Sequence, residues 1–271
     1  MIHEAENVEA PIAPTSAPAS PLEASIHSAS SDDLLSAAAD PALTEDLALA
    51  LLKRGDLPPR VLDQLSKNGN VLKLRKVKVA LVCHPRTPRH VSVPLARQFY
   101  TFDLMKVALS PTVPADVKVA ADNTLVARLK MVTIGERLSL ARLASGRIAG
   151  ALLLDGEARV MRTALENARL TETLVIQALL RPETGPALVQ AVSQHTKWSF
   201  RREIRIALLR TKHLPLGRVL EFSRGIPLPL LRDVLHSSRL PARTKEHVLR
   251  ENQATPAAPG HSRESASGSR L

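Results

Sequence analysis

The sequence is poor in the residues on which many folds and many active sites depend. Aromatic side chains make up 2% of its 271 residues, and Cys83 is its only cysteine. A single cysteine excludes an intramolecular disulfide and a cysteine-rich zinc site. Strand-rich cores usually draw on aromatic and β-branched side chains, so the scarcity of aromatics argues against a β-sheet protein.

Long apolar runs are also missing. The sequence contains no stretch of about 18 uncharged apolar residues, so we expect no membrane span. Its first residues contain neither a positively charged segment nor an apolar core, so we expect no secretory signal. Together with the lone cysteine, these features favour a cytoplasmic protein.

What the sequence does contain favours helices. Apolar residues make up 44% of the chain, and most of them are Leu, Ala and Val, accompanied by many Arg residues. Leu, Ala and Arg lose little conformational freedom in a helix. We therefore predict an all-α protein with a buried core.

The charge is unevenly distributed. The net charge is +11, yet residues 1–46 hold nine acidic side chains and no Lys or Arg, which leaves 37 basic and 17 acidic side chains in the remainder. Such a basic body would attract anionic partners. The acidic segment could also fold over the basic body and compete with an anionic partner.

Composition divides the chain into three parts. Residues 1–42 are rich in Pro, Ala, Ser and Glu and are predicted to form a disordered acidic tail, apart from a short helix near Asp32 to Ala39. Residues 43–252 are predicted to form one helical repeat domain. Residues 253–271 again resemble a disordered tail.

A short turn pattern recurs through the predicted domain. It consists of an apolar pair, a polar turn, an apolar residue, and then Pro, Thr or Ser. It occurs as LLKRGDLP (51–58), LVCHPRTP (81–88), VALSPTVP (107–114), ALENARLT (164–171), VSQHTKWS (192–199), LLRTKHLP (208–215) and VLHSSRLP (234–241), with RLASGRIA (142–149) as a degenerate copy. Spacings between copies vary from 16 to 35 residues, so the repeats are irregular.

The last residue of each copy predicts the start of a helix. Proline fits the first helical turn, where its missing N–H would have no partner. Thr171 and Ser199 are predicted to act as N-caps, and Thr133 with Glu136 forms a predicted capping box. The runs between copies have amphipathic spacing, with buried faces predicted within 156–166, 172–180 and 204–209.

Helices this short are marginal alone and must bury their apolar stripes against neighbours. Stacked helical hairpins provide such burial. We therefore predict an irregular HEAT-like α-solenoid of about eleven to thirteen short helices.

Residues from Thr133 to about Arg250 resemble a bacterial HEAT-like, leucine-rich-repeat-variant family of helical repeat proteins of uncharacterised function. The motifs that carry the resemblance are GERLSLA (135–141), LENARLTE (165–172), the stretch from Trp198 to Pro215, and the turn HPRTP (84–88). The chain departs from the family pattern where the turn Asn is replaced by His84, Ser110, Thr211 or Ser237. The resemblance implies a helical solenoid and no particular activity.

No motif of a known catalytic or metal site stands out. The sequence has no HExxH, no GxSxG, no phosphate-binding loop and no dinucleotide fingerprint. Cys83, His84 and His90 are the closest grouping of metal-ligand types, but adjacent residues converge poorly on one ion and a fourth ligand is missing. We predict no catalytic residue, no metal, no cofactor and no small-molecule substrate.

Basic runs are the best candidates for partner binding. The candidates are Lys73, Arg75, Lys76 and Lys78 in one run and Arg201, Arg202 and Arg205 in another, extended by Arg210, Lys212, Arg239, Arg243 and Lys245. Brought together on one face, they would form an electropositive groove. The alternative is an ordinary solvated face on which Lys and Arg cover apolar surface.

Trp198 is the only tryptophan. It is either a binding hot spot or a wedge between two repeats. From all these features we predict a non-catalytic scaffold that binds a protein partner. The alternative function is nucleic-acid binding through contacts of a basic face with the phosphate backbone.

Overall fold

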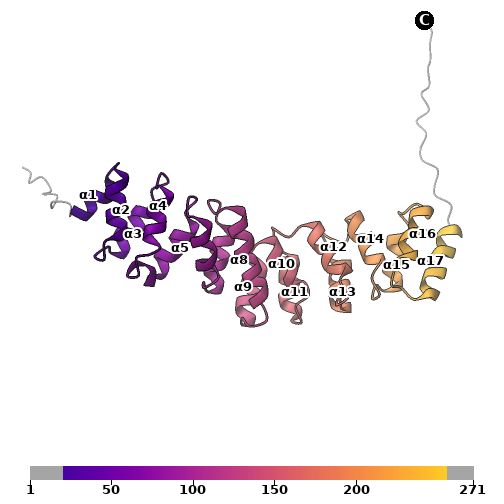
Figure 1. Ribbon diagram of the computed structural model, residues 1–271. Helices are drawn as coiled ribbons and strands as arrows, with labels where there is room; N and C mark the ends of the chain where they lie inside the picture. Colours follow the sequence, from indigo (N-terminus) through magenta and orange to yellow (C-terminus); the bar gives the residue numbers. More distant parts are fainter. Residues whose placement is uncertain (1–20, 255–271) are drawn as a thin grey trace, which may run out of the picture. The chain divides into compact units, whose positions relative to one another are not determined.

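The computed structural model describes residues 21–254. Over that range its only regular secondary structure is helical, as Figure 1 shows. It contains 17 α-helices, one short 3-10 helix and no strand between those limits. None of the described helices is long and apolar enough to cross a membrane. The predictions for residues 1–20 and 255–271 lie outside the described residues.

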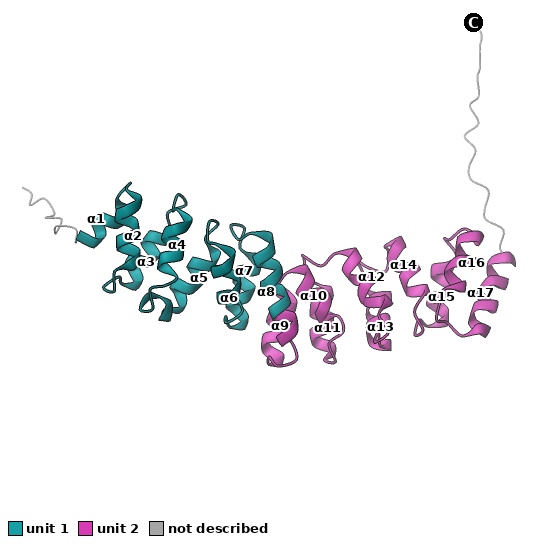
Figure 2. Cartoon of the chain, viewed as in Figure 1, with its two compact units in different colours: residues 1–124 teal, residues 125–271 magenta. Residues whose placement is uncertain are grey.

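The chain forms two compact units, residues 1–124 and 125–271, coloured separately in Figure 2. The helices that begin in unit 1 are α1 (Pro21–His27), α2 (Ser31–Ala39), α3 (Glu45–Leu52), α4 (Pro59–Leu65), η1 (Val71–Lys73), α5 (Arg75–Cys83), α6 (Arg89–Ala96), α7 (Thr101–Leu109) and α8 (Ala115–Arg128). Within this unit α2 packs on α1 and α4, α3 packs on α1 and α5, and α5 packs on α6 and α7. The main contacts among α1 to α7 thus join each helix to the next helix or the next but one.

Unit 2 is built in the same way. Its helices are α9 (Ile134–Leu143), α10 (Gly146–Leu152), α11 (Ala158–Leu165), α12 (Glu172–Leu180), α13 (Pro186–Gln194), α14 (Arg202–Leu209), α15 (Leu216–Ser223), α16 (Leu228–His236) and α17 (Ala242–Ala254). Here α9 packs on α10 and α11, α12 packs on α10 and α14, and α15 packs on α14 and α17. Each helix therefore buries its apolar stripe against helices that are near it in sequence.

The predicted helix number was too low, and the reason lies in the connections. The recurring turn pattern marks eight of the sixteen connections between successive α-helices. The other connections do not match the pattern in full: Ser66–Leu74 lacks it, and Arg181–Gly185 matches it only in part. Helices separated by such connections were therefore merged in the sequence-based prediction.

The predicted boundary of the acidic tail was also wrong. Residues 21–42 contain α1 and α2, and Ile26 and Leu34 belong to the same buried apolar cluster as the helices that follow. The short helix expected near Asp32 is α2. Six of the nine acidic residues of segment 1–46 therefore lie in the folded part of unit 1. Only three remain in the segment that was expected to fold over the basic body and compete with an anionic partner. Composition missed this because neighbouring helices, rather than the segment itself, bury its few apolar side chains.

The copies of the turn pattern that end in proline predicted helix starts correctly. Pro58, Pro88 and Pro215 each occupy the N-cap position directly before a helix. Both hydrogen bonds of the capping box between Thr133 and Glu136 are present. Ser199 was predicted wrongly, because α14 begins three residues after it.

The N-cap prediction for Thr171 was right in position only. This residue precedes α12, but its side chain makes no capping hydrogen bond. The predicted buried faces of 156–166 and 204–209 are confirmed, since Val160, Ala164, Ile204 and Leu208 are all fully buried.

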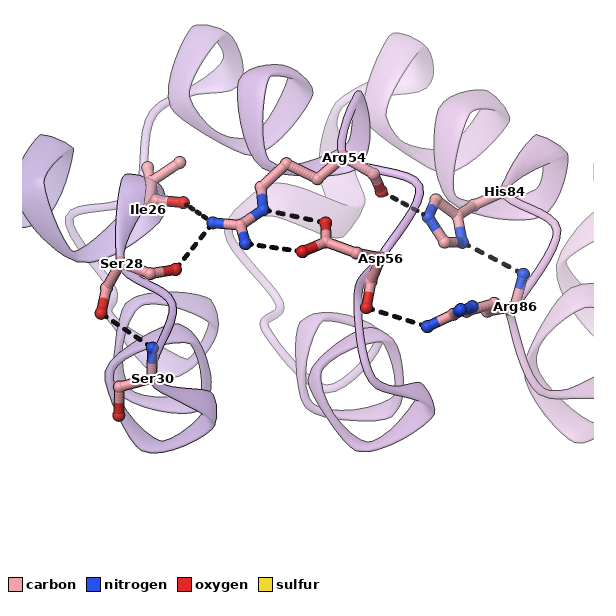
Figure 3. A network of polar contacts seen from close by, with 7 residues as sticks. All are labelled: Ile26, Ser28, Ser30, Arg54, Asp56, His84 and Arg86. Carbon is pink, nitrogen blue, oxygen red and sulfur yellow. Dashed lines mark hydrogen bonds and ion pairs between the residues drawn. The ribbon is translucent and has the colours of Figure 1, made fainter.

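Side chains of one connection bind backbone carbonyls of an earlier connection, as Figure 3 shows. Arg54 Nη1 donates to the carbonyl oxygens of Ile26 and Ser28, at 2.7 and 2.8 Å. The guanidinium is held in place by a two-point contact with the Asp56 carboxylate, at 3.2 and 2.9 Å. One step further along, Arg86 Nη1 donates to the Asp56 carbonyl at 2.9 Å. Connections about one helical pair apart are thereby joined in series.

His84 is a central member of this network. Its Nδ1 accepts a hydrogen bond from the Arg86 N–H at 3.2 Å, and its Nε2 lies 2.9 Å from the Arg54 carbonyl. Because a carbonyl only accepts, Nε2 carries the proton. The ring therefore fixes its own turn with one nitrogen and binds the preceding connection, at the Arg54 carbonyl, with the other.

Two asparagines make the same pair of hydrogen bonds in other connections. Asn68 Oδ1 accepts from the Asn70 N–H, while its Nδ2 donates to the carbonyls of Ala38 and Asp40. In unit 2, Asn167 Oδ1 accepts from Arg169 N–H, and its Nδ2 donates to carbonyls at the end of α9. His84 thus makes the same two kinds of hydrogen bond as Asn68 and Asn167, because imidazole also offers one acceptor and one donor.

Replacing His84 by Ala should lower the free energy of unfolding by about 1 to 3 kcal/mol, because both hydrogen bonds are lost at a buried turn. His84→Asn should cost less than about 1 kcal/mol, because the amide offers the same two groups. Urea unfolding followed by circular dichroism measures both. His236→Ala, at an exposed histidine of unit 2, is the control and should stay within about 0.5 kcal/mol of wild type. Equal losses for His84→Asn and His84→Ala would contradict this role.

Candidate functional site

Helices α3, α5 and α7 of unit 1 border a groove of about 720 Å³. Three cavities in unit 2 are smaller, at about 350, 280 and 270 Å³. A volume of 720 Å³ lies within the range of ligand pockets, which is about 300 to 1,000 Å³. This groove is the best candidate for a binding site.

The floor of the groove is apolar. Its lining includes Leu49 from α3 and Leu74, Val79, Ala80 and Cys83 at or within α5. The periodicity of α5 explains the arrangement, because its fully buried Val77 and Leu81 face the core and place 79, 80 and 83 on another side.

The rim of the groove carries charges of both signs. Lys73, Arg75, Lys76 and Lys106 supply the positive charges, and Glu45 and Asp103 supply the negative ones. The two acids are already paired with two of the bases. Lys73 and Lys106 form no ion pair within residues 21–254 and leave the rim with excess positive charge.

Arg75 is fixed by its neighbours. Its Nε and Nη2 donate to the two carboxylate oxygens of Asp103 at 2.7 and 3.0 Å, and this hydrogen bonding raises the pKa of Arg75. Its guanidinium also lies 5.6 Å from the centre of the Tyr100 ring. Lys76 is held more loosely, with Nζ 3.7 Å from Glu45.

The structure thus brings together three of the four residues of the first basic run. Lys73, Arg75 and Lys76 line the groove, whereas Lys78 is half-buried and is not part of its lining. The sequence analysis missed Leu49, Asp103 and Lys106, which come from other helices. The sequence did hold one indication of the Arg75–Asp103 pair. The two residues are 28 positions apart, which is close to the distance between neighbouring copies of the turn pattern in this part of the chain.

The second basic run lies at the start of α14 in unit 2. Arg201 and Arg202 are exposed. Arg205 Nε donates to the Ser199 carbonyl at 2.7 Å, and its guanidinium lies 5.2 Å from the Phe222 ring centre. Arg205 therefore has a structural role, and its role in partner binding stays a prediction.

Trp198 is also structural. It is 2% exposed, and its indole N–H donates to the Leu165 carbonyl, 33 residues earlier, at 3.0 Å. Lys197 Nζ covers the ring at 4.2 Å from its centre. This burial contradicts the prediction of Trp198 as a partner-binding residue, because the side chain joins two connections and leaves almost no surface for a partner.

The cysteine and histidines near residue 83 do not converge. Cys83 lies in the groove, His84 binds the preceding connection, and His90 Nε2 lies 2.9 Å from Asp63. Among residues 21–254, no group of three His, Cys, Asp or Glu side chains is placed to hold a metal ion.

The surroundings of Cys83 make its thiol less acidic. Burial raises the pKa of its thiol, and nearby Lys106 opposes the shift only partly. A raised pKa keeps the thiol protonated at neutral pH, which is the opposite of what activates a cysteine nucleophile.

Comparison with models of known protein families, with curated proteins and with solved structures finds no match to this chain.

The shift at Cys83 predicts its reactivity. Because the folded thiol has a raised pKa, its thiolate fraction at neutral pH is below that of the unfolded chain, and its alkylation should be slower. The rate in the folded protein should keep rising at pH values where the unfolded chain has levelled off. Iodoacetamide labelling with and without urea, followed by mass spectrometry, measures both rates. A folded protein labelled faster than the unfolded chain at neutral pH would contradict a buried thiol.

Trp198→Phe should lower the free energy of unfolding by about 1 to 3 kcal/mol, because it leaves the Leu165 carbonyl without its donor. Urea unfolding followed by circular dichroism measures the change. Phe200→Leu, at an aromatic residue that is 73% exposed, is the matched control and should have an effect of at most about 0.5 kcal/mol. A similar effect of both substitutions would argue against the structural role of Trp198.

Proposed function

We propose that this protein is a non-catalytic scaffold, a HEAT-like α-solenoid, that binds an acidic segment with an apolar face from a partner protein. The observation that supports it most strongly is the α3–α5–α7 groove, with its apolar floor and its two unpaired lysines. An apolar floor provides burial, and the surrounding charges provide orientation and specificity.

The packing within each unit supports the solenoid part of the proposal. The principal helix contacts are between near neighbours in sequence, as expected for stacked repeats. Hydrogen bonds that span 23 to 33 residues recur at successive connections. The resemblance to HEAT-like repeat proteins agrees with both features.

The charges of the rim support an acidic ligand. Asp103 and Glu45 already neutralise Arg75 and Lys76 in part, so the remaining attraction comes from Lys73 and Lys106. They lie beside an apolar floor, where an opposite charge on a ligand would be better shielded from solvent than on an open surface.

Nucleic-acid binding is the alternative, and the geometry favours it less. Of the predicted phosphate-binding residues, Arg75 and Arg205 direct their guanidinium groups to protein acceptors. Binding through phosphates would weaken steeply as salt increases. A gel-shift series across salt with random single- and double-stranded DNA tests this alternative.

Reversing the two unpaired charges should disrupt partner binding. The double variant Lys73→Glu with Lys106→Glu should weaken binding of a purified partner by about tenfold or more, because like charges would then face an acidic segment. The matched control is Lys53→Glu with Arg60→Glu, which makes the same change of charge at exposed positions of unit 1 outside the groove. The control should bind nearly as well as wild type.

Cys83 gives an independent measure of where the partner binds. The partner should slow alkylation of this single thiol at the groove floor in wild type and in the control, and should do so much less in the groove variant. Equal loss of affinity in both double variants, or a bound partner that leaves Cys83 fully reactive, would refute groove binding.

A further inference from the structure

A second site lies in unit 2, where three connections meet around a cavity of about 270 Å³. Its polar and charged lining consists of Thr184, Arg210, Thr211, Lys212, His213, Ser237 and Arg239, with Leu179, Leu180 and Pro182 as an apolar wall. The lining includes four basic side chains and no carboxylate. This composition differs from the α3–α5–α7 groove, where two acids pair with two of the bases.

The charge of this cavity arises from the turn pattern itself. The copies LLKRGDLP and LLRTKHLP are alike at both ends but differ in the middle. Asp56, which neutralises Arg54 in the first copy, corresponds to His213 in the second. The connection at 208–215 therefore has no acid to neutralise its basic side chains.

The basic side chains of this cavity also make few hydrogen bonds to the rest of the described chain. Arg86 and Arg169, at the sixth position of their copies, donate to carbonyls of earlier connections at 2.9 and 3.1 Å. Arg239 occupies the same position in its copy, but its Nη2 lies 3.5 Å from the Leu180 carbonyl, a long contact. Its backbone N–H donates to the Arg210 carbonyl at 3.0 Å, which holds this residue beside the cavity.

Arg210 adds an unsatisfied donor. Its Nε is buried and has no hydrogen-bond partner in the part of the chain that the structure describes. A buried donor without an acceptor costs about 1 to 3 kcal/mol, and more when it is charged. An anion in the cavity would be attracted by the positive charge of this guanidinium. The hydroxyl protons of Thr184 and Thr211 are donated to the Ala178 and Leu208 carbonyls, so the basic groups are the available donors.

We propose that this cavity binds a phosphate monoester group. Its basic side chains converge on one small concave site, which suits a single ligand of high charge density. A nucleic-acid strand instead presents a row of singly charged diesters and favours an extended basic track. A phosphorylated side chain of a partner and a small phosphorylated metabolite share this chemistry. The site belongs to unit 2 and does not depend on the groove of unit 1.

Calorimetric titration of the full chain at constant ionic strength tests the site. The probes are inorganic phosphate, O-phosphoserine and dimethyl phosphate. Wild type should bind the first two saturably, with one site per chain, and should bind the diester about tenfold more weakly or not at all. A peptide with one phosphoserine among Gly and Ala identifies the source. Tighter binding than O-phosphoserine indicates a phosphoprotein, and equal binding indicates a small metabolite.

Two double variants distinguish binding in the cavity from a general effect of the protein's positive charge. Lys212→Gln with Arg239→Gln removes two exposed charges from the lining and should weaken monoester binding by about tenfold or more. Lys130→Gln with Arg232→Gln removes two exposed charges elsewhere in unit 2 and should leave it unchanged. Circular dichroism spectra that match wild type show that both variants fold.

Three results would overturn the proposal. They are the absence of saturable monoester binding to wild type, equal weakening in the two double variants, and dimethyl phosphate bound as tightly as O-phosphoserine. The last result would assign the cavity to nucleic-acid backbone. None of them bears on the groove in unit 1, because its charge-reversal variant retains this cavity.

Discussion

The fold depends on how the carbonyl groups at the ends of short helices are satisfied. Each α-helix leaves its last carbonyls without partners inside the helix, and helices of seven to fourteen residues have many such ends. In this chain the missing donors come from side chains roughly one helical pair later, such as Arg54, His84, Asn167 and Trp198. The same contacts set the distance between consecutive connections. They therefore fix which faces of neighbouring helices meet, and hence where grooves and cavities form.

Both candidate sites follow from this arrangement. The groove of unit 1 lies across helices α3, α5 and α7, which pack in series, so its floor consists of apolar side chains that the core leaves uncovered. The cavity of unit 2 lies among the connections themselves, where the turn pattern supplies bases without an acid. Helices joined by one turn pattern can thus carry sites of different chemistry. The residues in the middle of the pattern vary, whereas the residues at its two ends mark where one helix ends and the next begins.

The sequence predicted the helical class and many helix starts, because proline and capping residues act locally. Pro58, Pro88 and Pro215 have the same consequence in any context, and so does the Thr133 capping box. It predicted α2 only as a short helix in a disordered tail and missed α1, because both helices are buried by their neighbours α3 and α4 and not by their own sequence. It also assigned a binding role to Trp198, whose burial and hydrogen-bond acceptor cannot be recognised from sequence. Three groove residues from the basic run at 73–78 were found, but the acid partners and the floor were not, because packing alone assembles them.

Hydrogen exchange of the native protein tests the central claim most directly. If hydrogen bonds between connections hold each unit together in series, His84→Ala should increase amide exchange in helices α3 to α6, next to the lost contacts, and leave α1 and α9 to α17 at wild-type protection. That local pattern is what nearest-neighbour stacking predicts. A uniform loss of protection throughout unit 1, or unchanged protection in α3 to α6, would contradict the account.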